Sequence, residues 1–411
     1  MNPKRLAGMT LGVLTAMGGF VDIGDIVANA ETGARFGMSL AWVVVFGVLG
    51  ICVFAEMAGR VAAVSGRPVF DLVRERLGAK VGLANLFASF FVTFLTLIAE
   101  VAGVALALQL ATDVNYLLWI PLVGILVWLL IWRVRFENME RVFGLTGLAL
   151  VVMAVALWKL SPDWGDLFHQ ANHPAVPRGE GRPTLAYFGI ALFGAAMTPY
   201  EVFFFSSGAV EERWSRRDLV LNKANVFIGF PLGGFLSLSL MGLTATVFKP
   251  RQISVDHLSQ AALPTSVALG KVGLALVIVG IFAATFGAAL ETALSCSYTV
   301  SQYFGWQWGK RTAPRDAARF HLLVIVALLS AVLIGLTGVD PIMVTEYSIV
   351  LSAAALPLTY IPILLVANDP DYMGERVNGR LSNVAGSIYL VVLVVVSAVT
   401  IPLMIATGAG S

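Results

Sequence analysis

The sequence has little charge, few histidines and only two cysteines. Asp, Glu, Lys and Arg make up 13% of its 411 residues, about half the share in soluble domains, and 58% of the residues are hydrophobic. A water-soluble surface is therefore excluded. The net charge is only +2 and the basic residues form no single patch, so no nucleic-acid partner is indicated. Because Cys52 and Cys296 both lie in apolar segments, no disulfide scaffold is implied.

Signatures of catalysis are also missing. The chain has no nucleotide-binding loop, no Gly-x-Ser-x-Gly elbow and no clustered His and Cys ligands. Its four histidines, His169, His173, His257 and His321, have no metal-ligand spacing and are interpreted as surface residues in loops or near a helix end. We therefore expect neither an enzyme nor a bound cofactor.

Long apolar runs are what the sequence has instead. About 20 apolar residues cross the roughly 30 Å hydrocarbon layer as a helix, and eleven segments approach or exceed that length. The chain, 1–411, is thus predicted to be a single transmembrane domain in a lipid bilayer. The expected spans are 8–30, 38–64, 83–110, 115–134, 142–160, 185–209, 219–247, 269–303, 319–337, 342–367 and 384–407.

Basic residues are distributed unevenly between the loops on the two sides. With the N-terminus placed in the cytoplasm, 20 of the 27 lysines and arginines fall on the inside, Arg135 among them. The positive-inside rule therefore predicts a multi-pass protein of the plasma (inner) membrane with a cytoplasmic N-terminus and an outside C-terminus. The seven on the other side are Arg35, Lys159, Arg178, Arg182, Lys249, Arg251 and Lys271.

The N-terminus also has the look of a secretory signal peptide. Lys4 and Arg5 precede an apolar stretch that ends in the small-residue run 28–30. Asp22 and Asp25, just before the supposed cleavage site, argue against that alternative, as do the many spans that follow.

Two of the expected spans are interrupted in a similar way. Residues 18–25 place three glycines and two acids in mid-membrane, and residues 194–201 place a proline and an acid there. The interruptions open two sets of five spans, a first repeat over 8–160 and a second over 185–367, with an additional helix at 384–407. An odd number of spans per set gives inverted repeats, whose broken helices meet at the membrane midplane. Unwound backbone persists at that depth only where it lines a site.

Asp22 and Asp25 are the chemically informative residues. A charge near the bilayer centre costs at least about 2.5–3.5 kcal/mol, and neither broken span offers a lysine or arginine in its inner part. The compensating charge is therefore expected to arrive as cargo; the alternative is that both acids are protonated or face water. The other available ligands are the Thr198 hydroxyl and carbonyls freed around Asp22 and Ala195. Such an all-oxygen set suits magnesium, calcium or manganese.

These motifs resemble those of a known family. The run Asp22-Ile23-Gly24-Asp25 and the following 33–37 look like the Asp-Pro-Gly-Asn and Gly-Ala-Gln-Phe-Gly of the Nramp divalent-metal transporters, and 198–200, Thr-Pro-Tyr, falls where that family has Met-Pro-His. The likeness continues at 65–76, 340–341 and 373–380, so it spans nearly the whole chain.

The resemblance implies an all-α integral membrane protein of the LeuT-type fold, with two inverted repeats of five helices, broken helices 1 and 6, and an eleventh helix. It also implies a metal site and residues that line the pathway or surround the ligands. The implied ligands are Asp22, Asp25, Ala195 through its carbonyl, and Thr198, and the surrounding residues are Ile23, Gly24, Glu100, Tyr200 and Ser348.

Departures from the family pattern concern the hardness of the site. The family's sulfur ligand becomes Thr198, its asparagine becomes Asp25, and a glutamine of helix 10 becomes Ser348. Each change removes softness or bulk, or adds charge. The pattern resembles the Nramp-related magnesium transporters, which implies magnesium, and also manganese, as transported substrate.

Other departures concern energy coupling. Proton-coupled members use a histidine after the helix 6 proline and an aspartate in helix 3, where this chain has Tyr200 and Leu97 and keeps only Glu100. Tyrosine does not exchange its proton near neutral pH as histidine does. We therefore expect uncoupled uptake driven by the membrane potential, which supplies about 4.6 kcal/mol per 100 mV for a divalent ion.

Three other functions are weighed against this one: a proton-coupled manganese or iron transporter of the Nramp type, a LeuT-fold amino-acid transporter, and a structural or receptor-like membrane protein. Two acids in one break argue against the anionic group of an amino acid. The oligomeric state stays open, a monomer included.

Four further acids lie in or near the expected spans. Glu100 and Glu291 belong either to the pathway or to local packing, whereas Glu56 and Glu346 lie nearer helix ends and are interpreted as solvated.

Overall fold

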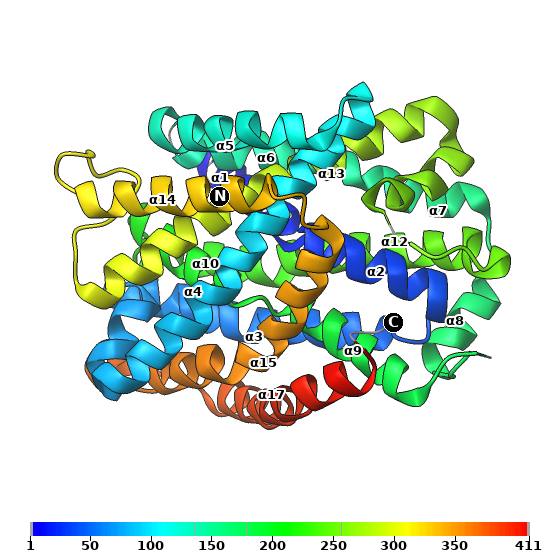
Figure 1. Cartoon of the computed structure of the whole chain (residues 1–411). Helices are drawn as coiled ribbons and strands as arrows, with labels where there is room; N and C mark the ends of the chain where they lie inside the picture. The colour runs from blue at the N-terminus through cyan, green and yellow to red at the C-terminus, as the bar shows by residue number, and fades with distance from the viewer. Residues whose placement is uncertain (1–2, 135, 178, 256, 409–411) are drawn as a thin grey trace.

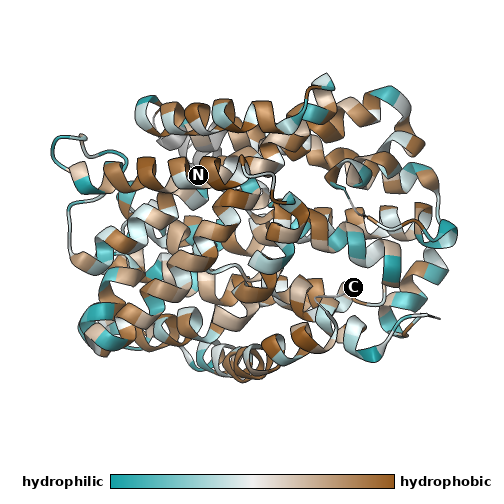
Figure 2. Cartoon of the chain, in the orientation of Figure 1, coloured by the Kyte–Doolittle hydropathy of each residue, from teal (hydrophilic) through white to brown (hydrophobic). Residues whose placement is uncertain are grey.

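The computed structural model describes residues 3–134, 136–177, 179–255 and 257–408, and in these ranges every regular element is helical. The helices pack into one bundle (Figure 1). Hydrophobic residues run along the helices, while polar residues gather in the loops at the left and right ends of the view (Figure 2). Arg135 and Arg178, both counted in the loop-charge argument, lie outside the described residues.

The first part of the chain, as far as residue 160, holds the elements that the sequence places in the first repeat. They are α1 (Pro3–Phe20), α2 (Ile23–Phe36), α3 (Ala41–Ser65), α4 (Val69–Thr112), α5 (Tyr116–Arg133), α6 (Phe136–Gly147), the 3-10 turn η1 (Leu148–Leu150) and α7 (Val151–Leu160).

The second part begins with a short helix in the connecting loop. Its elements are α8 (Trp164–Asn172), α9 (Arg182–Ala196), α10 (Pro199–Glu211), η2 (Arg216–Asp218), α11 (Leu219–Ala224), the π-helical η3 (Asn225–Gly229), α12 (Phe230–Val247), η4 (Lys249–Arg251), α13 (Leu258–Phe304), α14 (Ala318–Gly335), α15 (Pro341–Ala367), α16 (Pro370–Met373), η5 (Gly374–Arg376) and α17 (Arg380–Ala406).

The predicted number of spans agrees with these helices. Within the described ranges, ten segments are long and apolar enough to cross a membrane, and the bent pair α1 and α2 makes an eleventh. Two helices are longer than predicted, because α4 and α13 each continue through a kink, at Gly78 (φ 82°) and Gly270 (φ 63°). Glycine adopts such positive φ values without steric cost, so each helix bends at its glycine and continues beyond it.

The loop expected over 161–184 is partly helical. Its helix α8 begins where the Asp163 carboxylate accepts the Asp166 N–H at 3.1 Å. This side-chain cap replaces a hydrogen bond that the first helical turn lacks, which lets a short helix form in a loop rich in proline.

The interior of the bundle is built around α2 and α4. Twelve of the 14 residues of α2 are buried, and this helix packs on α12, α9 and α15. In turn, α4 lies between α13 and α15, and α17 covers α15 from outside. Because α17 exposes large side chains such as Val391 and Ile405, it provides a surface suited to lipid. The break between α1 and α2 is therefore central.

Glu56 corrects one expectation from the sequence. It is only 8% exposed and not solvated, because Arg60, one helical turn later, places its Nε 3.0 Å from the Glu56 Oε1. The same guanidinium donates to the Arg376 carbonyl at 2.7 Å and to Asn378 Oδ1 at 2.5 Å. This buried ion pair ties α3 to the segment after α16. Glu346, the other acid interpreted as solvated, is partly exposed.

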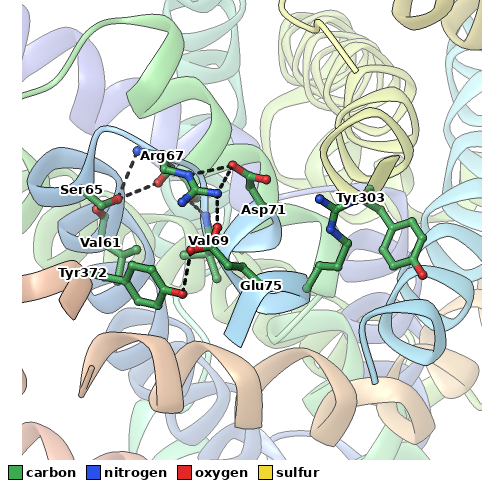
Figure 3. A network of polar contacts seen from close by, with 10 residues as sticks. Val61, Ser65, Arg67, Val69, Asp71, Glu75, Tyr303 and Tyr372 are labelled. Carbon is green, nitrogen blue, oxygen red and sulfur yellow. Dashed lines mark hydrogen bonds and ion pairs between the residues drawn. The ribbon is translucent and has the colours of Figure 1, made fainter. Parts of the chain in front are cut away.

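A second, exposed network joins the turn between α3 and α4 to α16 (Figure 3). Arg67 contacts Asp71 Oδ2 at 2.9 Å and Glu75 Oε2 at 2.7 Å, and Tyr372 donates its hydroxyl to Glu75 Oε1 at 3.2 Å. The hydrogen bonds that the Arg67 guanidinium donates to Glu75 and Asp71 raise its pKa. Partial burial and the Glu75 carboxylate raise the pKa of Tyr372. These contacts hold the turn in place, and we call this set of residues the clasp.

Candidate metal centre

The first span breaks where the glycines and acids of its sequence predict. Helix α1 ends at Phe20, α2 begins at Ile23, and their axes differ by 59°. Asp22 lies between them in an extended conformation and caps α2, since its Oδ1 accepts the Asp25 N–H at 2.7 Å. The Ile23 N–H donates to Glu100 Oε1 of α4 at 2.9 Å. Two carboxylates thus satisfy backbone groups that the break would leave without partners.

The sixth span breaks as well, between Ala196 and Pro199. Met197 (φ −125°, ψ 48°) and Thr198 (φ −65°, ψ 131°) leave the helical region. Proline has no N–H, so residue 199 cannot donate to the Ala195 carbonyl as an α-helix would require. The carbonyl oxygen of Ala195 is therefore free of its usual helical partner, as expected of a ligand in a broken helix.

Both aspartates are buried and held by uncharged donors. Asp22 is 2% exposed and Asp25 1% exposed. Tyr200 donates its hydroxyl to Asp22 Oδ2 at 3.1 Å, which joins the two broken spans directly. Asp25 accepts Asn29 Nδ2 on Oδ1 at 2.9 Å and the Ser237 hydroxyl on Oδ2 at 2.5 Å. Their burial contradicts the alternative that these acids face water.

No basic side chain compensates this pair. Over the described parts of the chain, no lysine or arginine lies within ion-pair distance of Asp22, Asp25 or Glu100. A carboxylate oxygen accepts two hydrogen bonds, so the Asp25 oxygens, each with one side-chain donor, keep capacity for a further partner. The arrangement is a pair of buried carboxylates that a cation can compensate.

The remaining predicted residues fall around this pair to different extents. Thr198 is buried at the start of α10, and its side chain hydrogen-bonds Glu201. Ser348 of α15 is buried, but its hydroxyl pairs with that of Thr96 at 2.8 Å. Over the described ranges, no hydrogen bond joins Ser348 to either aspartate.

Gly24 lets α15 approach the break closely. A Cβ at this position would lie 2.7 Å from Cγ2 of Ile349 and 3.1 Å from Oδ1 of Asp22. Ile23 beside it is fully buried. Both residues follow Asp22 directly, and any larger residue at position 24 would come close to the Asp22 carboxylate.

Four residues at the site carry no role in the sequence prediction. Asn29 follows Asp25 by four residues, so helical spacing offered a signal for their contact. Ser237 lies in α12, and Tyr360 donates to the Met197 carbonyl from α15 at 3.2 Å; both come from distant helices and gave no local signal. Glu201 is buried next to Tyr200.

The break offers two carboxylates, so an ion bound there would need neutral oxygen ligands as well. Among the described residues, no group of three or more His, Cys, Asp or Glu side chains is arranged to hold a metal ion. An ion at Asp22 and Asp25 would therefore also use carbonyl, hydroxyl or water oxygens, which hard divalent cations accept. The chemistry of the site fits such a cargo and offers no nucleophile or acid–base pair for catalysis.

A bundle of ten or eleven apolar spans, with the first and sixth broken, has the LeuT-type fold of membrane proteins. Solved structures share this fold. A mutant of the Eremococcus coleocola manganese transporter matches with a TM-score of 0.75 and 19% identity over 99% of this chain and 88% of that one. A nucleobase-cation-symport-1 family transporter, in a closed conformation with bromovinylhydantoin bound, gives 0.62 and 16% over 97% and 91%. A Na⁺-coupled sialic acid symporter gives 0.60 and 15% over 96% and 89%.

The family follows from the sequence itself. The model of the family described as natural resistance-associated macrophage protein-like, Nramp, matches residues 12–402. The chain therefore belongs to the Nramp family, whose members are metal-ion transporters and not enzymes.

Proposed function

We propose that this Nramp protein carries Mg²⁺, and also Mn²⁺, across the membrane by alternating access without obligatory proton transport. One observation carries the proposal: Asp22 and Asp25 are buried at the broken helix and held by uncharged donors only. Two carboxylates without a basic partner match the charge of one divalent cation, and the burial cost of an uncompensated pair is relieved when that cation binds.

The preference for a hard ion rests on the absence of sulfur from this set. Thr198 supplies a hydroxyl, and the Ala195 carbonyl lacks its helical partner. The neighbouring thioether, that of Met197, points toward α3, where a Cβ on Gly50 would lie 2.7 Å from its sulfur. Oxygen ligands favour magnesium and manganese over softer metals.

Uncoupled transport is proposed because the titrating groups of coupled relatives are replaced. Tyr200 keeps its hydroxyl on Asp22, and Leu97 is a fully buried hydrocarbon in α4. The membrane potential then supplies the driving force, about 4.6 kcal/mol per 100 mV for a doubly charged ion.

Glu100 favours a second candidate, proton-coupled manganese or iron transport. Its Oε1 accepts the Ile23 N–H, but its buried Oε2 has no partner. A buried carboxylate with a free oxygen and no basic neighbour can hold a proton next to the metal site. The two candidates therefore differ in what Glu100 does while the ion moves.

Alternating access in our proposal uses two inverted repeats, 8–160 and 185–367, with 384–407 as an additional helix. The broken spans that open each repeat support it. The bias of basic residues supports a cytoplasmic N-terminus and an outside C-terminus in the plasma membrane.

Flux measurements in proteoliposomes separate the coupled and uncoupled candidates. A Mg²⁺- or Mn²⁺-sensitive dye and a pH dye are enclosed together, and a potassium diffusion potential is imposed with valinomycin. We expect metal entry that rises with inside-negative potential while lumenal pH stays constant. Lumenal acidification in strict proportion to metal entry would instead establish proton coupling.

Binding measurements test the site itself. Isothermal titration of the purified chain with Mg²⁺, Mn²⁺, Fe²⁺ and Zn²⁺ should show binding of the first two, and Asp22→Ala should remove the part of that binding that occurs at the metal centre. Glu375→Ala, in the 3-10 turn η5, is the control and should bind as the wild type does. If Asp22→Ala binds both ions normally, the structural or receptor-like class becomes the better interpretation; heat released by an amino acid instead would favour that type of transporter.

A further inference from the structure

A cavity of about 260 Å³ lies along α1, on the way from the break in the first span to the end of the bundle where α1 begins. We call that end the N-terminal face. The cavity is bounded by α1, α10, α13 and the π-helical η3. At one end it meets Leu11 and Trp214 near that face, and at the other it meets Gly19, close to the end of α1. We call this cavity the vestibule. It reaches the neighbourhood of the break without containing Asp22 or Asp25 among its lining residues.

Glu291 of α13 lines the vestibule at its deep end. A Cβ on Gly19 would lie 3.2 and 3.3 Å from the two oxygens of the Glu291 carboxylate, so the acid lies directly against the last turn of α1. Across the described residues this carboxylate has no hydrogen bond and no ion pair with a basic side chain. The carboxyl group is therefore available to a ligand that enters the cavity.

Two further acceptors in the vestibule are buried without donors. Glu201 is 5% exposed and its Oε1 has no partner; Asn225 is also 5% exposed and its Oδ1 has none. Leaving a buried acceptor unsatisfied costs about 1–3 kcal/mol, and more for a charged group. Natural proteins tolerate that cost mainly where a ligand or water completes the bonding.

The segment that carries Asn225 has an unusual backbone. Residues 225–229 form a π-helix, and Pro231 shortly after lacks the N–H that an α-helix would give to the carbonyl of residue 227. Single π-turns inside longer helices are frequent at functional sites. Here the π-turn begins at Asn225, which lines the cavity.

We propose that Glu201, Glu291 and Asn225 form a second divalent-cation site in the vestibule, distinct from the pair Asp22 and Asp25. Two carboxylates neutralise one divalent ion, and an amide oxygen is a suitable hard ligand. Six waters occupy about 180 Å³, so the cavity of about 260 Å³ accommodates an ion with its first hydration shell. The site's role as the stage between the metal centre and the N-terminal face rests on the proposed function; its capacity to bind does not.

The experiment counts Mn²⁺ bound to the purified full chain by electron paramagnetic resonance. Asp22→Ala combined with Asp25→Ala removes the metal centre, and Glu201→Gln combined with Glu291→Gln removes the vestibule carboxylates without changing their shape. We expect two ions per wild-type chain, one in either double variant, and none in the quadruple variant. Glu346→Gln is the matched control and should retain two, since Glu346 lies in α15 away from the vestibule.

The two double variants test the two sites separately. Unchanged stoichiometry in the Glu201→Gln, Glu291→Gln variant overturns the vestibule site, whereas unchanged stoichiometry in the Asp22→Ala, Asp25→Ala variant overturns the metal centre and leaves the vestibule site standing. A diffraction experiment on the wild type soaked in Mn²⁺ keeps the test independent of variant folding. A second anomalous peak between Glu201 and Glu291 supports the proposal, and a single peak at Asp22 and Asp25 contradicts it.

Discussion

In the proposed metal centre, the side chain at position 198 is the ligand expected to select between hard and soft ions. A threonine hydroxyl is a hard, neutral oxygen, and Thr198 is buried at the start of α10. A thioether at the same place would be polarisable and would favour softer ions. We therefore expect the preference for hard ions to depend on the atom at position 198, and the charge of the site to depend on the two aspartates.

Replacing that atom should change selectivity. For Thr198→Met we expect the affinity for Cd²⁺ relative to Mg²⁺ to rise about tenfold or more, which corresponds to about 1.4 kcal/mol. Competition of Cd²⁺ against Mg²⁺ in the calorimetric assay measures it. Thr198→Val keeps the shape and removes the oxygen, so it should weaken Mg²⁺ binding without a gain for Cd²⁺; equal gains in both variants would show that volume and not sulfur is responsible.

At the scale of the elements, the broken helices are positioned by close backbone contact. Gly194 lies one turn before the break in α9, and a Cβ there would come within 2.3 Å of the Ile349 carbonyl oxygen of α15. Since a backbone oxygen cannot rotate out of the way, the two helices depend on glycine for their spacing. In the same helix, Gly189 has only an ordinary contact, 3.7 Å from Leu40 Cδ2.

The two glycines therefore make a matched pair of substitutions. Gly194→Ala should destabilise the protein by about 1–3 kcal/mol through forced separation of α9 and α15. Gly189→Ala should leave stability unchanged or slightly improved, because alanine favours helix. Thermal unfolding in detergent compares them, and a similar melting temperature for both would disprove the close-contact argument.

Ion pairs give a second contrast between elements. Arg60 and Glu56 are buried together, whereas the side chains of Arg67 and Glu75 are 39% and 51% exposed. Arg60→Ala leaves Glu56 buried without a counter-ion and should cost about 3–5 kcal/mol. Arg67→Ala, in the clasp of Figure 3, should cost at most about 1 kcal/mol.

Chemical denaturation of the two variants measures this difference. The double variant Glu56→Gln, Arg60→Gln removes both charges and should recover part of the stability lost in Arg60→Ala. Should the double variant be as unstable as the single one, the loss comes from packing or from the bonds to the loop near Asn378 and not from the unpaired acid.

For the whole molecule, the charge in the loops predicts the orientation in the membrane. The connections at the two ends of the bundle differ in their lysine and arginine content, with 20 of 27 assigned to the side of the N-terminus. A membrane potential and anionic lipid act on that asymmetry and on a divalent cargo alike. In the orientation that we propose, the vestibule lies toward the cytoplasm, where an ion would leave during uptake.

Cysteine labelling in intact cells tests that orientation. Cys52 and Cys296 are both buried, so background labelling should be low. Ser161→Cys and Ser215→Cys introduce exposed thiols on opposite faces. We expect a membrane-impermeant maleimide to label Ser161→Cys in intact cells and Ser215→Cys only after permeabilisation; the reverse pattern would invert the topology.

Interactions within one helix or between neighbours in sequence could be predicted from the sequence, and those between distant helices could not. The spacing of Asp22 and Asp25 and the proline at 199 located both breaks. The prediction for Glu56 was wrong for a physical reason. The sequence shows Arg60 four residues later, but this spacing allows an ion pair either in solvent or in the interior, and the sequence does not say which. The contact from Ser237 to Asp25 joins α12 to α2, and no local pattern encodes it.

By itself the sequence determined that the chain is a membrane protein, which segments span the membrane, and at which residues two of those segments unwind. It could do so because hydropathy, glycine, proline and charge act locally along the chain. Only the tertiary structure decided which groups meet at those breaks: Tyr200 on Asp22, Glu100 on the Ile23 N–H, and unpaired acceptors of three helices around one vestibule. Those contacts depend on how helices far apart in sequence pack. A buried polar group has or lacks a hydrogen-bond partner only once all its neighbours are in place.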